Sequence, residues 1–109
     1  MRIEALRSSA LELPEATEQP HFHYTSFRVR GKIFATVPPG EDTLHVFVGD
    51  EMRDQALALE PQSLEKLLWG GKVVGLRVAL AKAPSALVRQ LLREAWRLKA
   101  PKSLHAQLP

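Results

Sequence analysis

The chain contains no cysteine among its 109 residues. Disulfide bonds and thiolate chemistry are therefore excluded, and a zinc site would have to use histidine and carboxylate ligands. No apolar run approaches the ~18 residues that a membrane-spanning helix needs. The first residues, Met1 to Leu13, mix charged and apolar positions and lack the basic-then-apolar order of a signal peptide. These absences predict a cytoplasmic protein with no membrane partner.

Recognisable catalytic motifs are also missing. No serine has a neighbouring histidine and acid in a nucleophile pattern, and Gly70-Gly71-Lys72 lacks the spacing of a phosphate-binding loop. His21 and His23 could act as two metal ligands on one side of a strand, completed by Glu18 or His45. Ordinary packing explains the same histidine pair. We therefore predict a non-enzymatic protein with no metal or cofactor.

The composition is that of a folded domain, with 45% hydrophobic and 25% charged residues. A chain of this length forms one domain. We assign residues 1–104 to that domain and residues 105–109 to a C-terminal tail. The segment from Lys102 onward is expected to be partly disordered.

Charge is distributed unevenly along the chain, although the net charge is only +3. Residues 38–65 carry seven acidic residues and a single arginine. The stretch from Ala81 onward carries six basic residues and one glutamate. Basic segments attract nucleic acid and other polyanions. A solvated surface on a chain with polarised charge is the simpler alternative.

Alternating apolar and polar residues predict the strands of an antiparallel sheet. The first hairpin joins strands at Phe22–Arg30 and Lys32–Val37, because Gly31 can adopt the positive φ that a tight turn needs. Ile33, Ala35 and Val37 are expected on one face of the second strand. Further strands are predicted at Thr43–Val48 and Val73–Leu80.

Helices are predicted from apolar residues that recur with helical spacing and from the prolines that end them. The first runs from Met1 to Glu12, and the second opens at Asp50, whose carboxylate is a good N-cap. A short helical turn is expected from Ser63 to Leu68. The last helix starts near Pro84 and ends before Pro101.

This order of elements predicts an α+β fold, a two-layer sandwich with an antiparallel sheet of four to five strands and helices on one face. The order is helix, three strands, helix, one or two strands, helix. The other face of the sheet would then be open or used for pairing. A homodimer through that face is one alternative, and a protein or small-ligand partner is another.

Several segments resemble the MmcQ/YjbR-like family of small bacterial proteins. The resemblance covers roughly residues 5–104 and rests on the following segments: Leu13-Pro14-Glu15, Ser26-Phe27-Arg28-Val29, Gly31-Lys32-Ile33-Phe34-Ala35-Thr36, Glu94-Ala95-Trp96-Arg97-Leu98 and Ala100-Pro101-Lys102. The chain departs from many relatives before the late strand, where Trp69 is displaced and a histidine is missing.

The resemblance implies an α+β fold similar to that of type III secretion chaperones and CyaY-like proteins. Members of the family are commonly described as DNA-binding proteins that use β-hairpins as a double wing. This description rests on fold analogy, which is a weak basis for assigning function.

Two groups of cations are candidate nucleic-acid contacts. The basic hairpin comprises Arg28, Arg30 and Lys32, and could place its charges along a phosphate backbone. The arginine stripe on the last helix comprises Arg89, Arg93 and Arg97, spaced by four. Our leading hypothesis is DNA binding through these six residues. The alternative is a chaperone-like protein- or small-ligand-binding module that uses the open sheet face.

Overall fold

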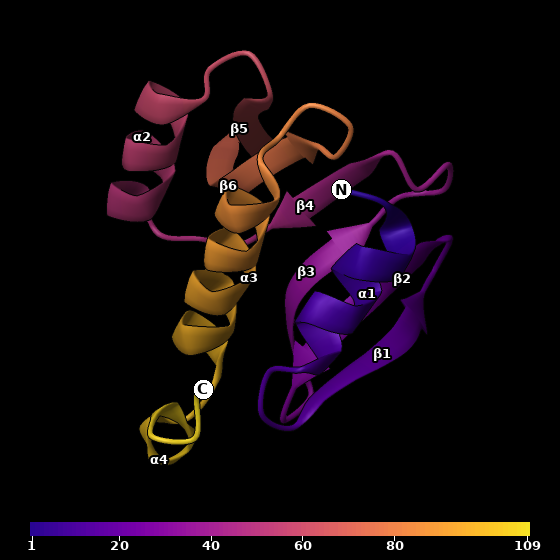
Figure 1. Ribbon diagram of the computed structural model, residues 1–109, viewed down its shortest axis with the longest axis vertical. Helices are drawn as coiled ribbons and strands as arrows, with labels where there is room; N and C mark the ends of the chain where they lie inside the picture. Colours follow the sequence, from indigo (N-terminus) through magenta and orange to yellow (C-terminus); the bar gives the residue numbers. More distant parts are fainter.

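The computed structural model describes the whole chain, residues 1–109, as a sheet covered by helices (Figure 1). The helices are α1 (Ile3–Leu11), α2 (Asp50–Leu59), α3 (Ser85–Lys99) and α4 (Lys102–His105). The strands are β1 (Ala16–His21), β2 (Tyr24–Val29), β3 (Lys32–Val37), β4 (Thr43–Val46), β5 (Leu64–Trp69) and β6 (Lys72–Ala79). The expected α+β class is confirmed.

All six strands form one antiparallel sheet in the order β1-β2-β3-β4-β6-β5. The last two strands are exchanged because the chain leaves β4 through α2, adds β5 at the edge, and returns in β6 beside β4. Six strands form, where four to five were predicted.

Helices α1 and α3 pack side by side across one face of the sheet (Figure 1). The hydrophobic core of 25 buried residues lies between them and the strands. Trp96 on α3 is fully buried there, and its indole nitrogen donates to the carbonyl oxygen of Pro14 at 2.9 Å. Helix α2 packs against β5, β6 and α3. The opposite face of the sheet carries no helix.

Two hairpins close with two-residue turns whose central residues both have positive φ. Arg30 and Gly31, at 50° and 79°, join β2 to β3, and Gly70 and Gly71, at 57° and 81°, join β5 to β6. Type I′ turns require this conformation, and they match the twist of the paired strands. The turn predicted at Gly31 is therefore confirmed.

Two strands form where the sequence predicted other structure. β1 covers the segment between the first predicted helix and the first predicted strand, and it tolerates Pro20 because it is an edge strand. β5 replaces the helical turn expected from Ser63 to Leu68, since Gly70-Gly71 folds it onto β6 as a hairpin.

Two predictions at the helix ends were also wrong. Asp50 is the first residue of α2 and Gly49 its N-cap, so the Asp50 carboxylate pairs with Arg53 at 2.8 Å and caps no backbone group. The segment after Pro101 forms α4, because Leu104 is buried at 3% exposure. No helix has the length and apolarity to cross a membrane.

Candidate functional site

The uncovered face of the sheet carries a row of polar side chains that runs across all six strands. Strand register aligns the following residues: Gln19, Ser26, Thr36, His45, Arg77 and Glu65. At one end, Arg77 donates to Glu65 at 2.9 Å and to His45 Nε2 at 3.4 Å. The three central members, Ser26, Thr36 and His45, are all buried.

Two β-bulges set which side chains face this row. Ala35 pairs with Phe27 and Ile33 pairs with Arg28, so Phe34 is an extra residue in β3. Phe34 and Ala35 both enter the core, and Ile33 turns to the open face beside Thr36. The prediction that Ile33 shares a face with Ala35 was therefore wrong. Val74 is the matching extra residue in β6.

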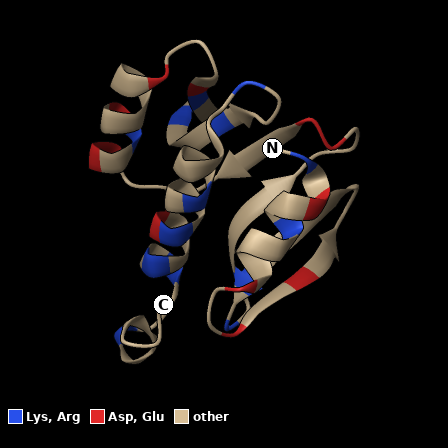
Figure 2. Cartoon of the chain, in the orientation of Figure 1, with Lys and Arg blue, Asp and Glu red and all other residues tan.

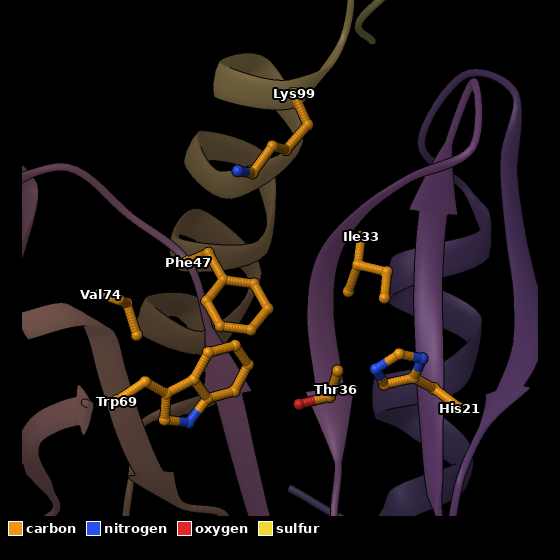
Figure 3. A pocket seen from close by; sticks show the side chains of 7 residues that line it. All are labelled: His21, Ile33, Thr36, Phe47, Trp69, Val74 and Lys99. Carbon is orange, nitrogen blue, oxygen red and sulfur yellow. The ribbon is translucent and has the colours of Figure 1, made fainter.

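A cleft opens on this face where β3 and β4 diverge (Figure 3). The last backbone bond between the two segments runs from Phe47 N to Phe34 O at 3.2 Å, after which the chain leaves for α2. The cleft has a volume of about 410 Å³, within the range of small-molecule sites. Its lining residues are His21, Ile33, Thr36, Phe47, Trp69, Val74 and Lys99.

Aromatic rings form one wall of the cleft. Phe47 and Trp69 meet edge to face, with ring centroids 5.1 Å apart. Gly75 makes this wall possible, because a Cβ there would lie 2.1 Å from the carbonyl oxygen of Val46. The backbone of Gly75 therefore lies close to the backbone of Val46 and Phe47.

Lys99 reaches the cleft from the helix layer (Figure 3). It belongs to the last turn of α3 and follows Leu92 and Ala95 at spacings of seven and four, so it continues the core-facing side of the helix. The Lys99 side chain enters the cleft. Its ammonium group makes no hydrogen bond or ion pair with any other residue.

Two buried polar atoms near the cleft lack hydrogen-bond partners. They are Thr36 Oγ1 and His45 Nδ1, on residues that face each other directly across β3 and β4. Burial lowers the pKa of His45 below its ordinary value of 6.5, and the nearby Arg77 guanidinium lowers it further. The imidazole is therefore neutral and accepts from Arg77 at Nε2, which leaves the proton on Nδ1.

Within the basic hairpin, only Arg30 is neutralised by an ion pair. Arg28 lies half-buried on the open face and donates to Ser26 Oγ at 3.0 Å. Arg30 binds both carboxylate oxygens of Glu15, at 2.6 and 3.0 Å. This hydrogen-bonded contact lowers the pKa of Glu15 below its ordinary value and raises the pKa of Arg30. Lys32 is exposed and forms no ion pair.

The arginine stripe lies on α3 in the helix layer, where Figure 2 draws basic residues in blue. Arg89 and Arg97 are exposed on the side of α3 that faces away from the core, and neither forms an ion pair. Arg93 is half-buried and donates to the Pro109 carbonyl oxygen at 3.0 Å. The fold thus separates Arg28 on the open sheet face from the stripe on the helix layer.

The histidines do not form the arrangement that the sequence suggested. His21 ends β1 and lines the cleft, whereas His23 belongs to the exposed turn before β2. They therefore do not share one face of a strand. No three histidine or carboxylate side chains lie together in a group that could hold a metal ion.

Of the residues that line the cleft, sequence reasoning considered only His21 as a candidate site residue, and it did so as a metal ligand. One signal was available for Lys99, a charged residue on the apolar side of an amphipathic helix. Thr36, Phe47 and Trp69 gave no comparable signal, because the two bulges and the divergence of β3 from β4 bring them together.

These features define a small α+β protein with an open, antiparallel sheet and a cleft on its uncovered face. A family model described as YjbR matches residues 11–98, and the chain belongs to the YjbR family. The crystal structure of protein DR2400 of Deinococcus radiodurans, a DUF419 domain, is similar in fold, with a TM-score of 0.79 and 24% identity over 99% of this chain and 89% of that chain. The comparison with curated proteins gave no match.

Proposed function

We propose that this YjbR-family protein is a non-enzymatic binding module that holds a small organic ligand in the cleft of the open sheet face. The observation that carries the proposal is the Thr36 hydroxyl, which lies at the cleft, is 1% exposed and has no hydrogen-bond partner. Buried polar groups are nearly always paired, so an orphaned one at a cavity marks a place for a ligand atom.

The polar groups of the cleft favour binding over catalysis. A hydroxyl nucleophile needs a base within hydrogen-bond reach, and Thr36 has none. His21 and Lys99 also line the cleft, but no hydrogen bond links either of them to Thr36 or to the other. The cleft thus has apolar walls and separate polar contacts.

A thermal-shift screen of neutral, acidic and basic small molecules tests this proposal. Hits should also change the fluorescence of Trp69, which is 51% exposed at the cleft, whereas Trp96 is fully buried. Val74→Phe should block the cleft and abolish binding. Val73→Phe is the matched control, because Val73 is equally half-buried but does not line the cleft. Hits that bind Val74→Phe and wild type equally would refute the proposal, as would a screen without hits.

Nucleic-acid binding is a second candidate, favoured by three exposed cations without acidic partners, Lys32, Arg89 and Arg97. Backbone contacts of this kind give weak sequence preference and strong salt dependence. Fluorescence anisotropy of labelled duplex and single-stranded DNA over a salt series tests it. Failure to bind at low salt would eliminate this candidate.

A further inference from the structure

We infer that the ligand of the cleft is an organic monocarboxylate with an apolar body, and that Lys99 binds its carboxylate group. The inference rests on the proposed function, since it names the chemistry of the ligand in that same cleft. Its basis is the combination of one unpaired cation with apolar walls and a buried, orphaned hydroxyl.

Lys99 is the source of charge complementarity. It is the only cation or anion among the seven lining residues whose charge is permanent at neutral pH, and no acidic side chain pairs with it. A cation that faces apolar walls gains from a ligand anion, because the attraction is stronger where water is partly excluded. The ligand group opposite Lys99 is therefore an anion.

The position of Lys99 favours a single negative charge over a phosphate dianion. The ammonium belongs to the last turn of α3, where the helix dipole places partial negative charge. Phosphate sites usually combine helix N-termini, backbone N–H groups or arginine forks. The cleft lining contains neither an arginine nor a helix N-terminus. A carboxylate matches a single point charge better.

The walls define the rest of the ligand. Phe47, Trp69, Ile33 and Val74 form apolar surface on both sides of the cleft, and the edge-to-face contact of the two rings leaves aromatic surface exposed. A flat hydrocarbon body packs well on such surface. In Figure 3, Lys99 and Thr36 lie at opposite ends of the group of labelled side chains. An elongated acid therefore fits the cleft.

The test uses 4-phenylbutyrate and its neutral amide, 4-phenylbutyramide, as probes of nearly the same shape. Binding is followed by isothermal titration calorimetry and by Trp69 fluorescence, with Trp69→Phe as the optical control. Wild type should bind the acid about tenfold more tightly than the amide, because a charge-assisted contact adds affinity. Lys99→Gln should remove this preference, so that the acid and the amide bind with similar affinity.

Arg97→Gln is the matched control, because it removes an equal charge from the same turn of α3 outside the cleft. It should keep the tenfold preference. Equal binding of acid and amide to wild type would overturn the inference and leave the proposed function standing. Unchanged acid binding by Lys99→Gln, or tighter binding of phenyl phosphate than of the acid, would also overturn it. If neither probe binds, the inference fails, and the screen with Val74→Phe decides the proposed function separately.

Discussion

At the scale of single residues, Thr36 combines a cost in stability with a position at the cleft. Its hydroxyl is buried without a partner, and such a group costs about 1–3 kcal/mol. Replacing it with a methyl group of the same shape should remove that cost. Thr36→Val is thus expected to raise the free energy of unfolding by roughly 1 kcal/mol, or roughly 4 °C in Tm. Thermal and urea denaturation measure both.

Thr36→Ser is the control for this prediction, because it keeps the hydroxyl and removes only the methyl group. It should be less stable than wild type, so the two variants should move in opposite directions. A loss of stability in Thr36→Val would mean that the hydroxyl is paired in solution, which would also weaken its assignment as a ligand contact.

The lowered pKa of His45 makes the stability of the protein depend on pH. Its folded-state pKa lies below the ordinary value of 6.5, because burial and then Arg77 disfavour the imidazolium. The unfolded chain therefore takes up a proton first as pH falls. The stability is complete above about pH 6.5 and declines as pH falls toward the folded pKa, with a measurable loss by pH 5.5.

Urea denaturation of wild type and His45→Gln near pH 7.5 and pH 5.5 checks this. The variant should be less sensitive to pH over this interval, because its side chain does not titrate. The interval stays above the ordinary pKa of 4.5 for Glu15, whose lowered pKa adds its own loss at more acidic pH. Equal pH dependence in the two proteins would contradict the role of His45.

At the scale of elements, the sequence predicted structure best where pattern and turn residues agree. β3 and β6 follow alternating apolar residues, and α3 follows a long helical pattern, so all three were placed correctly. α3 buries one clear face, and the pattern of apolar residues records it.

The elements at the sheet edges were harder to predict. β1 buries no residue and contains a proline, so its sequence has no strand pattern. Its pairing with β2 gives it regular structure, and a single-sequence pattern cannot record that pairing. β5 buries only Leu64 and Leu67, whose spacing of three also fits a helix. The pattern of apolar residues therefore could not distinguish a strand from a helix in this segment.

The cleft depends on local irregularities within regular elements. Phe34 in β3 and Val74 in β6 are extra residues in their strands. Beyond each of them, the side chains that would have faced the core face the open side of the sheet, and the reverse. Alternation analysis assumes an uninterrupted period of two, so a bulge moves each residue beyond it to the wrong face. The candidate site was therefore much less predictable than the fold that carries it.

At the scale of the whole molecule, the two-layer fold separates the candidate binding functions. The cleft and Arg28 belong to the open sheet face, and the arginine stripe belongs to the helix layer (Figure 2). Arg30 of the basic hairpin is paired with Glu15. A straight duplex is stiff over the length of this protein. We therefore expect DNA to contact one face at a time.

This separation predicts how substitutions affect any DNA binding. The triple variant Arg89→Ala, Arg93→Ala, Arg97→Ala should weaken it and reduce the slope of log K against log salt by roughly 0.9 for each phosphate that the variant no longer neutralises. Arg28→Gln should leave the affinity for DNA and this slope unchanged, because the Arg28 side chain donates a hydrogen bond to Ser26 on the opposite face. Anisotropy titrations of the two variants and wild type over one salt series measure this difference. An equal weakening in the two variants would show that DNA touches both faces and would refute a single-face interface on the helix layer.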